Sequence, residues 1–219
     1  MSPPSARSGS GSATDPGADR LILASASPRR REILERLGIE FEIVVPEVVE
    51  LRAGDPTTVV LENARRKERA GRALAGGAEG ATVLGVDTDV ALGERLLGKP
   101  EDEAGARKRL EALSGRTHEV LSGMVALGTA LGSAVPVERA AVAITEVTFA
   151  ELDPVTIDLY LASGEWEDRA GAYAIQGLGS ILIESIRGDF SNVVGLPVPT
   201  LIELIPPNLL QGRENRRKP

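Results

Sequence analysis

The feature that most constrains the fold is a short apolar run, residues 83–86, that leads directly into Asp87. A glycine-rich segment, residues 76–80, precedes the run, and the pattern predicts a buried strand that ends at Val86. A carboxylate at the end of such a strand is poorly solvated unless a cation or a metal ion pairs with it. Lys99 follows on an expected rigid loop with the sequence GKP.

An acid on a strand and a base on a nearby turn can serve an anionic, metal-bound substrate. The plainer interpretation is a turn-stabilising Asp87 and a solvated Lys99. These two residues by themselves favour the plainer interpretation, because single motifs are weak signals.

Strand and helix patterns alternate along the chain. We expect strands at residues 21–24, 41–45, 83–86, 117–127, 141–149 and 181–186, a hairpin turn within 92–97, and helices at residues 28–37, 55–75, 101–113, 153–164 and 199–210. This alternation predicts an α/β fold, and the strands joined by hairpins make its sheet mixed.

The domain organisation follows from the composition of the two ends. Residues 1–18 are rich in Ser, Gly, Pro and Ala, and we expect them to form a disordered tail. Residues 19–212 are expected to form a single domain, and residues 213–219 a charged C-terminal tail.

The composition excludes several classes of protein. The chain has no cysteine and one histidine, His118, so disulfides, thiol catalysis and a multi-histidine zinc site are excluded. Any metal must be held by oxygen atoms, which suits Mg²⁺ or Mn²⁺. The net charge of −7 and 3% aromatic residues argue against nucleic acid as a partner. We expect His118 to make a structural hydrogen bond.

Membrane and export signals are also missing from the sequence. No apolar run approaches the ~20 residues of a membrane span, so no membrane partner is expected. The first residues lack the apolar core of a signal peptide, and the expected compartment is therefore the cytoplasm.

A phosphate site is indicated where the first strand leads into a helix. Ser27 is a good N-cap and Pro28 suits the first helical position. Three arginines, residues 29–31, stand in the first turn, where cations oppose the helix dipole. A bound phosphate would explain that electrostatic conflict. The alternative is a solvated basic turn.

Lys67 is the second unusual cation. It shares one face of the helix over residues 55–75 with Val60, Ala64, Gly71 and Leu74. A lysine in that position commonly extends to solvent. If its ammonium group points inward, it needs an anionic partner.

Several separate stretches together resemble one family. They are SASPRR (residues 25–30), Lys67, GVDT (85–88), GKP (98–100), LSGRTH (113–118), AGAYAIQG (170–177) and VGLP (194–197). In this order, over roughly residues 21–205, they resemble the Maf family of nucleoside triphosphate pyrophosphatases. The resemblance favours a functional role for Asp87.

The resemblance implies an elongated mixed α/β sheet flanked by helices, like that of inosine-triphosphate pyrophosphatases, with two lobes around a cleft. It also implies a divalent cation, a homodimer, and cleavage of a nucleoside triphosphate to monophosphate and pyrophosphate. Asp87 would be the general base towards water, and a cation would be held by Asp87 and Glu50. The expected substrate-binding residues are Ser25, Arg29, Arg30, Lys67, Thr88, Lys99 and Gln176.

Two positions depart from the family pattern. Val49 stands where the family often has a second acid, which puts a two-acid metal cluster there in doubt. Asp89 stands where an apolar residue is common. At three other positions, Arg29, Thr88 and Gln176 resemble the branch that acts on dTTP and UTP.

Two other functions are compatible with the sequence. One is a different nucleotide preference within the family, such as 7-methyl-GTP. The other is a nucleotide-binding regulator of septum formation without turnover, although the presence of Asp87 favours catalysis.

Overall fold

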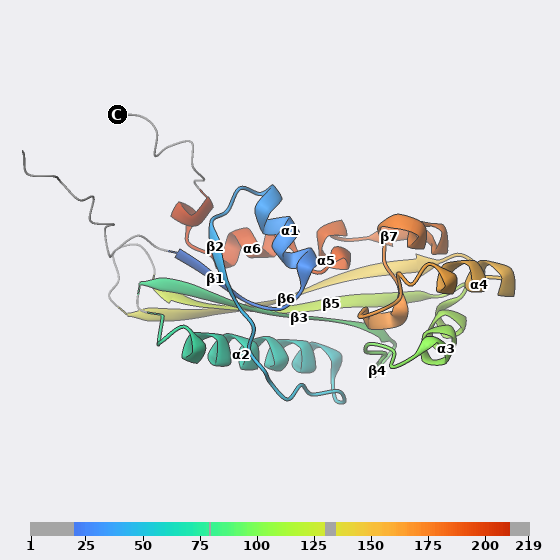
Figure 1. Ribbon diagram of the computed structural model, residues 1–219, viewed down its shortest axis with the longest axis horizontal. Coiled ribbons are helices and arrows are strands. Elements are labelled where there is room, and N and C mark those ends of the chain that lie inside the picture. Colours follow the sequence, from blue (N-terminus) through green and yellow to red (C-terminus); the bar gives the residue numbers. More distant parts are fainter. Residues whose placement is uncertain (1–19, 79, 130–134, 211–219) are drawn as a thin grey trace, which may run out of the picture.

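The computed structural model describes residues 20–78, 80–129 and 135–210. The two expected tails, residues 1–18 and 213–219, lie outside the described residues. Within the described part, a seven-stranded sheet forms the centre of the molecule, with helices on both of its faces (Figure 1).

The sheet is mixed, as the sequence predicts. Its strand order is β2-β1-β3-β5-β6-β7, and β4 pairs with β3. Strands β2, β1 and β3 are parallel, and the remaining pairs are antiparallel. The strands span Arg20–Ala24 (β1), Phe41–Val44 (β2), Ala81–Leu92 (β3), Arg95–Leu96 (β4), Thr117–Thr129 (β5), Pro136–Phe149 (β6) and Ile183–Arg187 (β7). The long strands β3, β5 and β6 give the sheet its elongated shape (Figure 1).

Helices cover the sheet unequally. The longest, α2, lies along one face, and α1, α5 and α6 lie on the other, while α3 and α4 are near one end (Figure 1). The helices span Pro28–Arg36 (α1), Pro56–Leu74 (α2), Glu103–Leu113 (α3), Pro154–Ala162 (α4), Phe190–Val194 (α5) and Val198–Leu204 (α6). In the described part of the chain, no helix combines the length and the apolar character needed to cross a bilayer.

Two large apolar clusters form most of the core. The end cluster joins α3 and α4 to the sheet through Leu110, Phe149 and Tyr160, all fully buried. The central cluster joins α1 and α6 to the sheet through residues such as Leu34 and Leu201. Both clusters bury apolar side chains that would otherwise face water, which is the main source of stability.

The strand around Asp87 is longer than the sequence predicts. The expectation that it ends at Val86 is wrong, because β5 pairs with β3 residue by residue from Val83 to Ala91. Asp87 therefore lies in the middle of a strand. Residues 81–87 of β3 are buried, Thr88 and Asp89 are half-buried, and Val90 and Ala91 are buried again.

The C-terminal elements also differ from expectation. The predicted strand 181–186 begins at Ile183, after a 3-10 helix over Gly177–Leu182. The expected loop 188–197 contains α5, which Asp189 caps through its bond to the Ser191 N–H. The last helix ends at Leu204, because Ile205 precedes a proline and is extended. Another 3-10 helix, Pro207–Leu210, follows it.

The buried face of α2 is shifted from the one predicted. Leu74 is 62% exposed, whereas Glu68 is fully buried. Asn63 is also buried and lies one turn before Lys67. Close packing of α2 against the sheet at Gly85 selects this face.

Candidate active site

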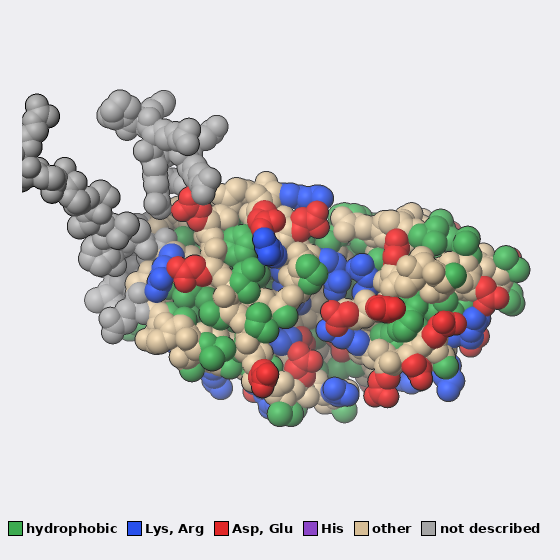
Figure 2. Space-filling view, viewed as in Figure 1, with side chains coloured by type: hydrophobic (Ala, Val, Ile, Leu, Met, Phe, Trp, Pro, Cys, Tyr) green, Lys and Arg blue, Asp and Glu red, His purple; other side chains and the backbone are tan. Residues whose placement is uncertain are grey.

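A cavity of about 790 Å³ opens at the edge of β3. Strand β1 pairs with β3 only as far as Ala24, opposite Gly85. Beyond Gly85, no strand of the described chain lies on that side of β3 until β4 pairs at Ala91. The cavity lies in this gap, and Figure 2 shows basic and acidic side chains gathered around a hollow in the middle of the molecule. Because successive strand residues point to opposite faces, β3 can supply side chains to both walls.

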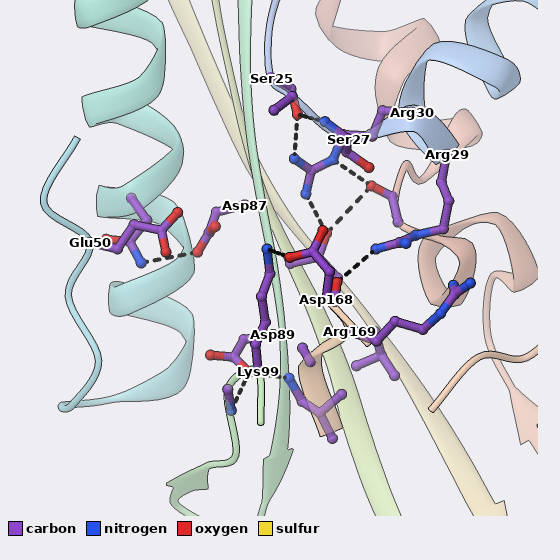
Figure 3. Close-up of a pocket in the computed structure, with 18 of the residues that line it drawn as sticks. Ser25, Ser27, Arg29, Arg30, Glu50, Asp87, Asp89, Lys99, Asp168 and Arg169 are labelled. Carbon is purple, nitrogen blue, oxygen red and sulfur yellow. Dashed lines mark hydrogen bonds and ion pairs between the residues drawn. The ribbon is translucent and has the colours of Figure 1, made fainter. Parts of the chain in front are cut away.

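Asp87 and Lys67 form the centre of the wall on the α2 side. The Lys67 Nζ atom lies 2.6 Å from Asp87 Oδ1 and 2.6 Å from Glu50 Oε1. Asn63 donates its side-chain amide to Asp87 Oδ2 at 3.0 Å. Lys67 thus points inward to anionic partners and not to solvent, and two carboxylates from different segments converge on one cation. These carboxylates, of Glu50 and Asp87, lie near each other in Figure 3.

Asn63 also holds the segment that carries Glu50. Its side-chain oxygen accepts the Leu51 N–H at 2.7 Å, and its amide donates to the Leu51 carbonyl at 3.0 Å. These two hydrogen bonds to the backbone of Leu51 fix an otherwise irregular connection against α2. Glu50 is thereby placed within reach of Lys67.

A glycine allows α2 to approach β3 closely enough for these contacts. A Cβ atom at Gly85 would lie 2.1 Å from the Ala64 carbonyl oxygen and 2.7 Å from the Glu68 nitrogen. Only glycine fits such a backbone-to-backbone approach. The same approach makes Glu68 a buried residue, although the sequence places it off the apolar face.

Arg30 dominates the opposite wall. Its side chain is 7% exposed and donates to the Gly195 carbonyl, the Ser25 hydroxyl and the Val86 carbonyl, each at 2.9 Å. A fourth bond, at 3.0 Å, goes to the Thr88 hydroxyl. The Val86 carbonyl is available because β1 has already ended.

All four of these acceptors are neutral. Burial lowers the pKa of Arg30 to about 10, which leaves it protonated at neutral pH. A guanidinium group has five N–H donors, so one N–H on Nη2 has no acceptor among the described residues. Arg30 therefore places a buried positive charge, without an ion-pair partner in the described chain, at the cavity.

The N-terminus of α1 faces the same cavity. Ser27 occupies the N-cap position as predicted, but its side chain makes no capping bond. Arg29 is half-buried, and its pKa is lowered by burial and by the neighbouring charge of Arg169. Cations crowded at a positive helix end are what a bound anion would stabilise.

Lys99 reaches the cavity from the loop after β4. Its Nζ atom lies 2.5 Å from Asp168 Oδ1, and Arg29 donates to the Asp168 carbonyl at 3.5 Å. Asp168 was not identified from the sequence, and no spacing links it to either cation. It lies between them in Figure 3.

The structure gives Asp89 a role that the sequence does not explain. Its Oδ1 atom accepts the backbone N–H of Gly98 at 3.0 Å and that of Val90 at 2.7 Å. The first bond ties β3 to the loop that carries Lys99. Burial raises the pKa of Asp89 to about 6.

The remaining expected residues also line the cavity. Thr88 lies on the Arg30 side and exchanges a hydrogen bond of 2.8 Å with Ser122. Gln176 is exposed at the rim, immediately before Gly177. The structure therefore brings all the sequence-predicted site residues to one cavity: Ser25, Arg29, Arg30, Glu50, Lys67, Asp87, Thr88, Lys99 and Gln176.

Asn63 and His118 remain to be compared with the sequence predictions. Asn63 was missed, although it precedes Lys67 by four residues and so shares its helix face, which is a usable signal. His118 makes the expected structural hydrogen bond: its Nε2 atom lies 2.8 Å from the Tyr173 hydroxyl, away from the cavity charges.

The fold and the cavity define a class of protein. It is a mixed α/β protein whose cleft gathers cations from several elements around a carboxylate pair, an arrangement suited to a polyanionic ligand. The chain belongs to the Maf family: the family model for Maf-like protein matches residues 20–207. The resemblance seen in the sequence is thereby confirmed.

Curated relatives agree over most of the chain. A dTTP/UTP pyrophosphatase of Anaeromyxobacter dehalogenans is 46% identical over 190 residues, covering 86% of this chain and 93% of that protein. A dTTP/UTP pyrophosphatase of Bacillus cereus is 46% identical over 185 residues, covering 84% and 87%.

Among solved structures, a nucleoside-triphosphatase / dITP/XTP pyrophosphatase of Mycobacterium abscessus matches 61% of this chain and 75% of that chain. The match has a TM-score of 0.41 and 19% identity.

Proposed function

We propose that this protein is a nucleoside triphosphate pyrophosphatase that converts dTTP and UTP to the nucleoside monophosphate and pyrophosphate. One observation carries the proposal. A buried Arg30, which has no ion-pair partner among the described residues, and a carboxylate pair on Lys67 line the same cavity. The names of the relatives, at about 46% identity over most of the chain, support the choice of reaction and substrate.

The cations are proposed to bind the triphosphate. A triphosphate carries several negative charges that must be balanced before a nucleophile can approach phosphorus. Arg30 offers its remaining N–H, Arg29 stands at the N-terminus of α1, and Lys99 reaches in from the opposite loop. Ser25 keeps Arg30 oriented through the hydroxyl that it presents at 2.9 Å.

Asp87 is proposed to activate water. Each of its oxygens accepts one bond, from Lys67 or from Asn63, and retains a lone pair for a water molecule. In the proposed step, water attacks the α-phosphorus while Asp87 takes its proton. The bond from that phosphorus to the bridging oxygen breaks, and pyrophosphate leaves.

A divalent cation, Mg²⁺ or Mn²⁺, is proposed to bind at Asp87 and Glu50. The donor set fits, because both groups are carboxylates that already converge on the Lys67 ammonium. Val49 supplies no ligand, and the described residues contain no cluster of three acidic or histidine side chains that could hold a metal. Substrate phosphates and water would complete the shell, as is usual for Mg²⁺. Such an ion would polarise the phosphoryl oxygens.

Base selection is proposed to depend on Gln176, with Thr88 and Arg29 beside it. The Gln176 amide offers both a donor and an acceptor, which suits the edge of a pyrimidine. Its exposed position at the cavity rim leaves room for a nucleoside.

We also propose that residues 19–212 act as one domain, with the end cluster and the central cluster as its two lobes. The family resemblance further supports a homodimer that works in the cytoplasm. Light scattering of the purified protein tests the dimer directly.

The proposal is tested by product analysis. Incubation with UTP, dTTP, GTP and 7-methyl-GTP in the presence of Mg²⁺ should give pyrophosphate and monophosphate, with UTP and dTTP the fastest. Orthophosphate and a diphosphate as products would reject the cleavage site. A preference for 7-methyl-GTP would reject the substrate assignment, and binding without turnover would indicate a regulator.

A further inference from the structure

Asp168 makes contacts that the proposed mechanism does not use. Its carboxylate lies 2.5 Å from the Lys99 ammonium, and its backbone carbonyl accepts a bond from Arg29 at 3.5 Å. These two cations come from different elements, the loop after β4 and the first turn of α1. One residue therefore engages two of the groups that are proposed to bind phosphate (Figure 3).

The charge balance of the cavity makes this contact consequential. Lys67 is already neutralised by Asp87 and Glu50, whereas Arg30 has only neutral acceptors. Lys99 is an intermediate case, because it has one carboxylate partner, Asp168, where Lys67 has two and Arg30 has none among the described residues. A phosphate that binds Lys99 approaches the same ammonium as the Asp168 carboxylate, and the repulsion between these two anions favours displacement of the carboxylate.

The Asp168 contact is suited to being exchanged. Both side chains are well exposed, at 60% for Lys99 and 70% for Asp168, and an exposed ion pair is weak. Replacing it therefore costs little.

The backbone of Asp168 holds a left-handed conformation, with φ of 55°, which is uncommon for a residue with a side chain.

Contacts of its neighbours hold the segment around Asp168. Arg169 donates to the Glu165 carbonyl at 2.5 Å. The Glu165 carboxylate accepts the backbone N–H groups of Leu178 and Gly179, each at 3.0 Å. The segment before Asp168 is thus joined to the turn that follows Gln176.

We propose that Asp168 is an internal competitor for the substrate's phosphates: its carboxylate occupies Lys99 in the free protein and is replaced by a phosphate group on binding. The inference rests on the proposed phosphate-binding role of the cavity. It extends that role, because Asp168 lowers the affinity for polyphosphate and favours release of pyrophosphate by returning to Lys99.

The test is the variant Asp168→Asn, because asparagine tolerates a positive φ and keeps the side-chain shape without the charge. Titration calorimetry with inorganic pyrophosphate, in the presence of Mg²⁺ and at low salt, should show a Kd roughly threefold to fivefold lower than wild type, the size expected for one exposed ion pair. The KM for UTP should fall with it. The matched control is Asp158→Asn on α4, which removes another exposed acid. Asp158 pairs with Arg107 on α3, and its replacement should leave both constants unchanged.

The competitor role requires Lys99. In a Lys99→Ala background, Asp168→Asn should no longer tighten pyrophosphate binding, which a general change of cavity charge would still do. Asp168→Gly, which also accommodates the positive φ, provides the same measurement if the asparagine variant melts early.

The outcomes separate the competitor role from the proposed function. Weaker or unchanged pyrophosphate binding in the folded Asp168 variants overturns the inference while the enzyme remains active. Absence of pyrophosphate binding in wild type and variants overturns the phosphate site and the inference together. Tighter binding without any nucleotide turnover supports the competitor role and rejects only the proposed reaction.

Discussion

Asp87 illustrates how a charged residue can occupy the middle of a strand. Its carboxylate is 11% exposed, which would be costly without compensation. Lys67 supplies an opposite charge to one oxygen, and Asn63 supplies an N–H to the other. The early end of β1 leaves the space in which a substrate could approach these oxygens.

Replacing Asp87 by Asn should reduce kcat for UTP by on the order of 10²-fold or more, because an amide cannot take a proton from water. The fold should persist, since Lys67 keeps Glu50 as a partner at 2.6 Å. Steady-state kinetics and a circular dichroism melt check both statements. Glu42→Gln, which changes an exposed acid paired with Arg20, is the control and should behave like wild type. A folded Asp87→Asn protein with near-normal kcat would remove Asp87 from the mechanism.

Replacing Gln176 by Ala should erode the preference for pyrimidines more than it lowers total turnover. In wild type we expect purine triphosphates to be weaker by at least roughly tenfold, which one well-placed hydrogen bond can supply. The ratio of kcat/KM for UTP to that for GTP measures this preference. If Gln176 only braces the turn at Gly177, the variant will lose turnover with all nucleotides equally and keep the ratio.

At the scale of elements, the packing of α2 on β3 determines the geometry of the carboxylate wall. The contact at Gly85 brings the two backbones together, and Lys67 and Asn63 then fall opposite Asp87. The helix therefore acts as the support for two cavity groups as well as a cover for the sheet.

Adding one methyl group at this contact should disturb both stability and activity. In Gly85→Ala, the new Cβ would lie 2.1 Å from the Ala64 carbonyl oxygen, so α2 must move away from β3. We expect a loss of about 3 kcal/mol in the free energy of unfolding, at the upper end for overpacking, with a large fall in kcat. Urea denaturation and kinetics measure the two effects.

Gly105→Ala is the matched control. The nearest atoms to its new Cβ are the ends of flexible side chains, Asp102 Oδ1 at 3.1 Å and Arg109 Nη1 at 3.2 Å. It should change stability far less. Equal losses in the two variants would show that the close α2 contact is not what sets the geometry.

The sequence predicts those elements whose pattern is local. The α2 helix, with Asp55 as its cap, and the mixed α/β class follow from periodicity and turn residues. The end of β3 does not, because its length is set by pairing with a distant strand, β5. Likewise the 3-10 helix after Gln176 depends on Glu165, whose carboxylate accepts the N–H groups of Leu178 and Gly179. Glu165 lies outside the AGAYAIQG motif, so the motif does not reveal this contact.

The candidate site shows the same division. Family motifs point to Arg30, Lys67, Asp87 and Lys99, and the structure places them at one cavity. Asp168 could not be found this way, because its importance comes only from its distance to Lys99. Contacts between residues distant in sequence are not encoded in a local pattern.

At the scale of the whole molecule, the end cluster contains a buried group that links stability to pH. His118 packs edge-on against Phe149 and Tyr173, with ring centroids 5.0 and 5.3 Å away. Burial lowers its pKa to about 4, from an ordinary value of 6.5. The folded protein thus keeps His118 neutral where the unfolded chain would bind a proton.

The free energy of unfolding should therefore fall as the pH is lowered from about 6.5 to about 4, because only the unfolded state gains the proton at His118 in that range. We expect the contribution of this residue to reach about 2 to 3 kcal/mol at the acid end. Asp89 acts with opposite sign, since its raised pKa favours proton uptake by the folded state, but it is common to wild type and variant. Urea denaturation of wild type and His118→Gln across this range isolates the effect as the difference between their pH slopes, and His118 is the chain's only histidine. Parallel slopes would show that His118 titrates alike in the folded and unfolded states.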